Sequence, residues 1–241
     1  MSRHQLRLTA LLALVLAACE GASSQGPEEN PATRKPKATP FALAAALRPV
    51  QTRNTKALGT GKLLVASRSL GDPHFARTVV LLVHSDANGA VGLILNRRSK
   101  LPISRVLKDV KAAKDRSDPV YVGGPVEMPS VYALLQTSNK IEGAERVTPG
   151  VYWISEKNLF QRTLGTKPDP AVFHVYLGYA GWSAAQLRAE VGLGAWFIFP
   201  GDKNAIFNAD PDSLWLEMIR KTELNVADSR PSTVQPPSAS F

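Results

Sequence analysis

Short apolar runs mark the strands that the sequence predicts. Between residues 59 and 221 these runs are rich in Val, Leu and Tyr and are bounded by Gly, Pro, Asp or Ser, a pattern typical of strands rather than helices. Asn88-Gly89 lies between two of the runs and is a strong hairpin signal. The predicted strands are 62–67, 77–84, 90–96, 120–124, 131–136, 151–155, 171–178 and 195–199.

Apolar positions three or four residues apart predict a smaller number of helices. Residues 101–116 are predicted to form one helix, whose apolar stripe is Ile103, Val106, Leu107, Val110 and Ala113. Three others are predicted from their end signals: 156–164 between Ser155 and Gly165, 184–191 between Ser183 and Gly192, and 211–221 with Asp210 as N-cap and Pro211 as first helical residue. Hairpins mixed with isolated helices indicate an α+β domain rather than a doubly wound one.

The patterned region is flanked by segments that lack such periodicity. Residues 20–57 contain five prolines and one aromatic residue, so they bury too little apolar surface to offset the chain entropy lost on folding. We predict a flexible tether there, with a root-mean-square reach of roughly 30–40 Å. Residues 222–241 are predicted to be a disordered tail. The region between them, 58–221, has a size that suits one domain.

The N-terminus has the pattern of a secretory signal. Arg3 and Arg7 precede an uncharged apolar run that is about half the length of a membrane-spanning helix. The run ends in Leu16-Ala17-Ala18-Cys19, which resembles a bacterial lipobox and contains the only cysteine of the chain. We therefore predict a signal peptide over 1–18 and lipidation of Cys19. The residue after Cys19 is Glu20 rather than Asp. By resemblance to the bacterial sorting rule for lipoproteins, this favours the outer membrane, on the side that faces the periplasm.

Positive charge is concentrated in one stretch. The chain of 241 residues has a net charge of +9, and residues 59–221 hold 20 Lys and Arg against 15 Asp and Glu. Eight of those basic residues and only Asp109 and Asp115 fall within 97–116. Two interpretations are open: a solvated face without a partner, or a surface for anionic lipid or lipopolysaccharide phosphates. The candidate residues are Arg105, Lys108, Lys111 and Lys114. Interleaved aromatic residues and a helix-turn-helix companion are missing, which argues against nucleic-acid recognition.

Catalytic chemistry has little support in the sequence. It contains no G-x-S-x-G, H-E-x-x-H or C-x-x-C motif, and we predict no catalytic residues, no metal and no cofactor. His84 and His174 are the two histidines on predicted strands that could meet in space, but structural roles are the default. The adjacent glycines at the end of the strand 120–124 offer a second kind of site. The candidate ligand-facing residues are Asn96, Gly123, Gly124, Pro125, Gly181 and Trp182. The alternative is that these glycines let strands cross while Trp182 packs in the core.

Five short sequence blocks follow one another in a distinctive order over 59–221. They are Gly61-Lys62-Leu63-Leu64 followed by Asp72-Pro73-His74-Phe75; Gly89-Ala90-Val91-Gly92 with Asn96-Arg97; Gly123-Gly124-Pro125-Val126; Gly178 to Trp182 with Gln186, Leu187 and Glu190; and Trp196, Pro200, Phe207 and Trp215. This order resembles the YqgE/AlgH family. Arg98 and Gln136 depart from it, since the family usually has Pro and His at these places.

The resemblance implies a fold more firmly than a function. It implies a single α+β domain with a split, mostly antiparallel sheet that curls into a pseudo-barrel and is flanked by helices. The biochemical role of the family is unsettled. Combined with the lipoprotein signal, the resemblance leads us to expect a non-enzymatic module that binds an envelope protein or an anionic lipid surface. The alternative is a cytosolic, transcription-regulator-like protein, if the N-terminus is not processed.

Overall fold

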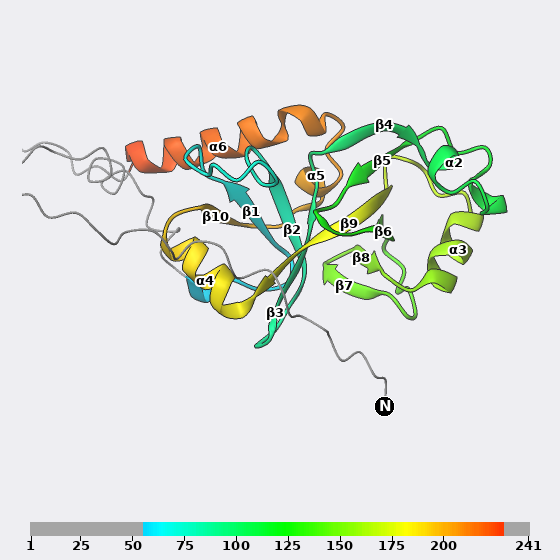
Figure 1. Cartoon of the computed structure of the whole chain (residues 1–241), viewed down its shortest axis with the longest axis horizontal. Coiled ribbons are helices and arrows are strands. Elements are labelled where there is room, and N and C mark those ends of the chain that lie inside the picture. The colour runs from blue at the N-terminus through cyan, green and yellow to red at the C-terminus, as the bar shows by residue number, and fades with distance from the viewer. Residues whose placement is uncertain (1–54, 229–241) are drawn as a thin grey trace, which may run out of the picture. The chain divides into compact units, whose positions relative to one another are not determined.

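The computed structural model describes residues 55–228, which belong to one compact unit (Figure 1). Cys19, the predicted signal peptide, the tether as far as residue 54 and residues 229–241 lie outside the described residues. The described chain begins with the 3-10 helix η2 (Thr55–Ala57) and continues into ten strands that form one strongly curled sheet. Apart from β5 with β9, every pairing between these strands is antiparallel.

One half of the sheet carries the most apolar strands. Its order is β10 (Trp196–Pro200), β1 (Lys62–Ala66), β2 (Val79–Ser85), β3 (Gly89–Ile94) and the end of β9 (Phe173–Ser183). β1 and β2 are buried in continuous runs because both of their faces are covered. The long helix α6 (Pro211–Asp228) lies along β1 on one side (Figure 1).

The other half contains the shorter and more polar strands. β9 pairs here with β6 (Val126–Gln136), which pairs with β8 (Val151–Ile154) and then β7 (Glu145–Thr148). On its other side β9 pairs with β5 (Pro119–Val122), and β5 with β4 (Arg98–Pro102). β4 and β7 were not expected, because their polar, largely exposed residues give no apolar run.

A single glycine lets β9 belong to both halves. Residues 173–177 pair with β6 and β5, whereas residues 180–183 pair with β3. Gly178 lies between these stretches with a φ of +65°, a conformation that favours glycine. The strand predicted to end at residue 178 therefore crosses from one half-sheet to the other and continues to Ser183.

The remaining helices are short. They are α2 (Ile103–Val106), the 3-10 helix η3 (Lys111–Ala113), α3 (Lys157–Gly165), α4 (Ala184–Gly192) and α5 (Lys203–Ile206). Ser183 caps α4 as predicted, since its side chain accepts from the Gln186 N–H. α3 is capped by the Glu156 carboxylate rather than by Ser155. α6 begins at Pro211 as predicted, but continues past residue 221, where the tail was placed, and Thr222 is buried.

The helix predicted over 101–116 is wrong as a single element. β4 occupies its first residues, α2 and η3 follow, and an irregular turn separates the two. The predicted apolar stripe nonetheless faces a core: Ile103 and Ala113 are fully buried beside α3 and β9 residues. The prediction of an α+β domain with a split, curled, mostly antiparallel sheet is confirmed.

Candidate functional site

The predicted basic face lies on the turns between β4 and β5. Arg105, Lys108, Lys111 and Lys114 are all exposed on this segment, and so is Lys100. None of these five side chains forms an ion pair with another residue of the described chain. We call them the basic surface. The exposed carboxylates of Asp109 and Asp115 lie within the same segment and offset part of its charge.

Two arginines that contribute to the sequence charge of this stretch have structural partners. The Arg116 guanidinium is buried and donates two hydrogen bonds of 2.7 Å to the Asp118 carboxylate. It also donates to the Pro168 carbonyl at 2.6 Å, so it ties the segment to the loop between α3 and β9. Arg98 pairs with Asp212 at the start of α6, at 3.1 Å on the surface. The basic surface is consequently smaller than the sequence indicates.

The paired glycines after β5 sit where the two half-sheets cross. A Cβ atom on Gly124 would lie 2.1 Å from the Tyr179 carbonyl carbon, and one on Gly123 would lie 2.3 Å from the Gly178 oxygen. Such distances leave no room for any side chain. Pro125 follows at the surface, exposed. The packing of these glycines against β9 matches the crossing interpretation.

Asn96 uses its side chain within the fold. Its Oδ1 accepts from the Val79 N–H at 2.8 Å, and its Nδ2 donates to the Arg77 carbonyl at 2.9 Å. Arg77 has a φ of 57°, an uncommon value for a residue with a side chain. Asn96 therefore clamps the strained turn that leads into β2.

Trp182 packs in the core together with Trp196. Both indole N–H groups donate to Glu190 Oε2, at 3.0 and 2.8 Å. Gly181, beside Trp182 on β9, is exposed, and a Cβ there would lie 3.1 Å from the Tyr179 ring. Gly123 and Gly124 thus lie at the crossing with β9, whereas the side chains of Asn96 and Trp182 are bonded to other parts of the fold. In the sequence Glu190 appears only as part of a motif, and nothing there indicates that it accepts hydrogen bonds from two tryptophans.

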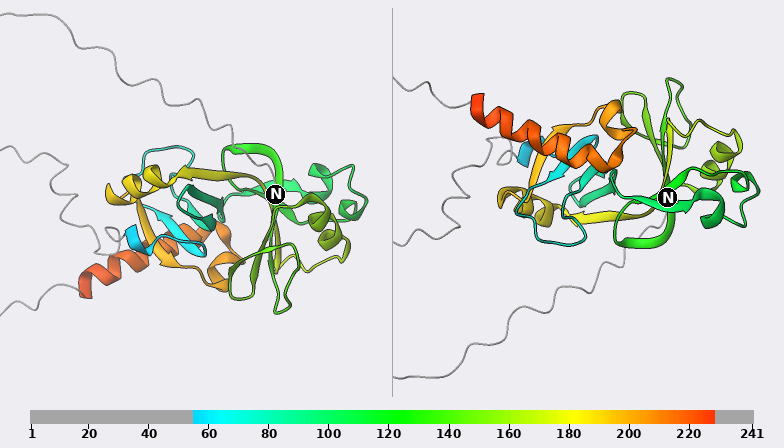
Figure 2. Two further views of the ribbon diagram at one scale, coloured as in Figure 1. Left: turned by 90° about the horizontal axis from the view of Figure 1, so that it is seen from below. Right: turned by 90° about the horizontal axis from the view of Figure 1, so that it is seen from above.

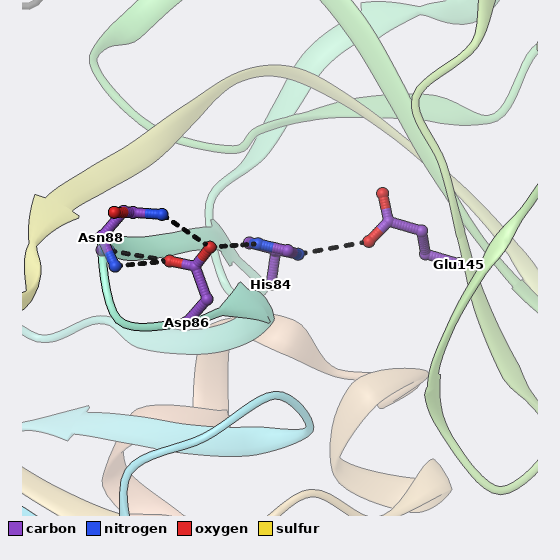
Figure 3. A network of polar contacts seen from close by, with 5 residues as sticks. His84, Asp86, Asn88 and Glu145 are labelled. Carbon is purple, nitrogen blue, oxygen red and sulfur yellow. Dashed lines mark hydrogen bonds and ion pairs between the residues drawn. The ribbon is translucent and has the colours of Figure 1, made fainter. Parts of the chain in front are cut away.

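His84 and Glu145 join the two half-sheets at the surface (Figure 3). The His84 Nδ1 atom lies 3.3 Å from Glu145 Oε2 on β7, and its Nε2 atom lies 3.6 Å from Asp86 Oδ2. Asp86 also accepts hydrogen bonds from the Asn88 and Gly89 N–H groups, which lower the pKa of its carboxyl. All three ionisable side chains are about half exposed. The two ring nitrogens of His84 face different carboxylates. The cluster therefore links the β2–β3 hairpin to β7 and does not converge on one point.

His174 occupies a different environment. Its ring stacks on Tyr121, with centroids 4.8 Å apart, and its other neighbour is Phe207 at 5.0 Å. Burial lowers the pKa of His174 to about 4, so the imidazole is neutral at pH 7. The two histidines therefore lie in different surroundings, His84 between exposed carboxylates and His174 between aromatic rings. Over residues 55–228 no group of three or more His, Cys, Asp or Glu side chains is arranged to hold a metal ion.

No helix within the described part of the chain combines the length and apolar character needed to cross a membrane.

The sequence and the fold have clear relatives. An AlgH-like family model (DUF179) matches residues 63–227. A UPF0301 protein of Chlorobium phaeobacteroides is 34% identical over 164 residues, which are 68% of this chain and 86% of the relative.

Two solved structures share the fold. The solution structure of the AlgH protein from Pseudomonas aeruginosa has a TM-score of 0.55 and 27% identity, covering 77% of this chain and 97% of that protein. The crystal structure of protein DIP2367 from Corynebacterium diphtheriae has a TM-score of 0.56 at 20% identity, covering 70% and 92%. The family match and the curated relative agree with the motif order along the sequence, and this chain belongs to the AlgH-like UPF0301 family.

Proposed function

We propose that this member of the family is a lipid-anchored, non-enzymatic interaction module of the bacterial cell envelope. Cys19 would carry the lipid, residues 20–57 would serve as a tether, and the basic surface would contact the phosphates of an anionic lipid surface. One observation carries the proposal: the cations of the basic surface are exposed, close together in the chain and without ion-pair partners in the described domain.

The signature residues whose contacts the structure gives have structural partners. Gly123, Gly124 and Gly178 make room for two crossing backbones, and Asn96 and Glu190 satisfy buried hydrogen-bond donors. The residues that carry the family resemblance are thus used to hold the fold. The basic surface, by contrast, is exposed and is not used to hold the fold.

The charges of the basic surface would give a modest attraction to an anionic membrane. A Lys or Arg close to an anionic membrane is worth about 1 kcal/mol, and the attraction falls off within a Debye length. Five cations, reduced by Asp109 and Asp115, would contribute about 3 kcal/mol. This attraction is weak by itself, but a protein with a single lipid chain binds a membrane stably when a polybasic patch is added.

The position of the basic surface determines how the domain would meet a membrane. η2, where the described chain begins, packs against α4, whereas α2 and η3 lie at the opposite end of the domain (Figures 1 and 2). A tether of the predicted length has a contour of about 130 Å when fully extended, enough for the domain to lie on its side or to turn over. The basic surface would then reach the membrane that holds the anchor.

Vesicle binding tests the proposed surface separately from the anchor. The full chain with Cys19→Ala is mixed with phosphatidylglycerol vesicles and with neutral phosphatidylcholine vesicles, and co-sedimentation is measured. We expect binding to the anionic vesicles alone, and we expect it to weaken as salt rises from about 50 to about 300 mM. Lys108→Glu with Lys111→Glu should lower the affinity at least about tenfold, since two attractions become repulsions.

Lys140→Glu with Lys203→Glu is the matched control. Both lysines are exposed, and the double change alters net charge equally while leaving the basic surface intact. Its affinity should stay within about twofold of the parent. Equal losses in the two double variants, or binding that does not respond to salt, would contradict the proposed surface.

A further inference from the structure

Three buried polar atoms in the described domain have no hydrogen-bond partner in the protein. They are Trp153 Nε1, His174 Nδ1 and the Tyr176 hydroxyl. Tyr176 is fully buried, and Trp153 is 8% exposed. Buried polar groups in native proteins are almost always paired, so three unpaired atoms require an explanation.

The strand registers place these three side chains on one face of the sheet. His174 and Tyr176 are two residues apart on β9, so both point to the same side. His174 is opposite Leu134 on β6, and Leu134 is in turn opposite Trp153 on β8. Residues that lie opposite each other on paired strands share a face. Leu134, Trp153 and Tyr176 all belong to the main hydrophobic core cluster, so this face is turned toward the interior of the domain.

Aromatic rings complete the surroundings of this face. Tyr121, opposite Tyr176 on β5, lies 5.4 Å from the Tyr176 ring and 4.8 Å from the His174 ring. Phe207, which follows α5, packs against the other side of His174 at 5.0 Å. We call these residues, with Trp153, the interior aromatic face. His174 is only partly buried, so the face reaches the surface at this residue.

The chemistry of the unpaired atoms defines what they would bind. An indole N–H can only donate a hydrogen bond, and a phenol hydroxyl donates readily. The imidazole of His174 is neutral, because burial lowers its pKa to about 4. None of the five residues of this face is Lys or Arg, and Arg98, opposite Tyr121, is already paired with Asp212, so a full negative charge would lack compensation. The matching partner is uncharged and offers oxygen acceptors.

We propose that the interior aromatic face is a binding site for a small uncharged molecule whose carbonyl oxygen accepts hydrogen bonds from Tyr176 and Trp153. His174 Nδ1 would supply the third polar contact, and the rings of Tyr121 and Phe207 would enclose the apolar part of the molecule. The site is independent of the basic surface and of the anchor, and it goes beyond the proposed function.

The tryptophans provide an internal test. The chain has four, and three indole N–H groups are already bonded: Trp182 and Trp196 to Glu190, and Trp215 to the Ala66 carbonyl at 2.8 Å. Only Trp153 lacks a protein acceptor among the described residues. We would titrate acetamide, the smallest primary amide with a methyl group, into the full chain carrying Cys19→Ala. Side-chain signals would be followed by 15N-resolved NMR.

The expected result is a saturable shift of the Trp153 indole and of the His174 imidazole, with the other three indoles unchanged. Tyr176→Phe removes one donor and should weaken acetamide binding about fivefold. Tyr152→Phe is the matched control, because Tyr152 precedes Trp153 on β8 and points to the opposite face of the sheet, and it should leave binding unchanged.

Three outcomes would overturn the proposal. One is the absence of saturable shifts at Trp153 and His174. Another is equal movement of all four indoles, which indicates a solvent effect. The third is contact of Trp153 with slowly exchanging water that acetamide does not displace, because the site would then hold ordered solvent only.

Discussion

Gly124 is the residue at which a side chain is least tolerated. A Cβ atom there would lie 2.1 Å from the Tyr179 carbonyl carbon, which belongs to the crossing strand and cannot rotate away. Gly124→Ala should therefore destabilise the domain by several kcal/mol or prevent folding, as judged by urea unfolding. Gly165→Ala is the control, because nothing lies within 4 Å of its Cβ position at the end of α3. It should stabilise by about 0.5 kcal/mol. Folding of Gly124→Ala with unchanged stability would show that these glycines are not required by packing.

His174 gives the stability of the domain a dependence on pH. The unfolded chain takes up a proton at this ring below about pH 6.5, whereas burial lowers the folded-state pKa to about 4, with Asp118 opposing the shift slightly. The unfolded state thus binds more protons between these values. Stability should fall as the pH drops from about 6.5 to about 4, by up to roughly 3 kcal/mol, and this contribution should not change further below pH 4.

His174→Phe isolates that contribution. Phenylalanine keeps an aromatic ring between Tyr121 and Phe207 but cannot be protonated. The difference in unfolding free energy between the two proteins should vary only within this pH window. Parallel curves for parent and variant would show that His174 is as easily protonated in the folded state as in the unfolded state.

Among the elements, the segment from β4 to β5 has the buried positions that its sequence predicts but not the predicted conformation. The spacing of Ile103, Val106, Leu107, Val110 and Ala113 identifies positions that contact a core. The segment is nevertheless not one helix, because hydrogen bonds to its own far end turn it back. The Ile103 N–H donates to the Asp118 carbonyl, and the Ser104 N–H donates to the Arg116 carbonyl. The spacing of apolar residues indicates which side chains face inward. It does not indicate hydrogen bonds to residues farther along the chain.

The Arg116–Asp118 pair holds this segment in place. Arg116→Met would leave a nearly buried carboxylate without its partner, a change that typically costs about 3–5 kcal/mol. Hydrogen exchange should accelerate at Ile103 and Ser104 before it does in β1 and β2. Adding Asp118→Leu should recover much of the loss, because no charge remains buried. Arg98→Met, at the exposed pair with Asp212, should cost less than about 1 kcal/mol. Equal losses in the two single variants would contradict this role.

The strands could be predicted where their residues are apolar and not elsewhere. The buried runs of β1 and β2 follow directly from the pattern, while β4 and β7 carry charged residues at the margins of the sheet. The candidate site divides in the same way. Exposed lysines could be identified from composition, whereas the burial of Arg116 and the contact between His84 and Glu145 depend on long-range folding.

The whole molecule has two different ends. The chain enters the described domain beside α4, and the basic surface lies at the far end on α2 and η3 (Figure 2). If Cys19 is lipidated, this arrangement allows the anchor and the basic surface to act as two separate contacts with the envelope. A single lipid chain binds reversibly, and a second contact makes attachment stable. The account therefore depends above all on the modification of Cys19.

Lipidation of Cys19 is the measurement that tests this account most directly. The native chain and Cys19→Ala are expressed in a bacterium grown with a labelled fatty acid, and membrane and soluble fractions are compared. We predict that the native chain is labelled and sediments with the membranes, and that Cys19→Ala is unlabelled and soluble after a high-salt wash. If the native chain is unlabelled and cytosolic, the anchor and the envelope role are both contradicted, and the basic surface must serve another partner.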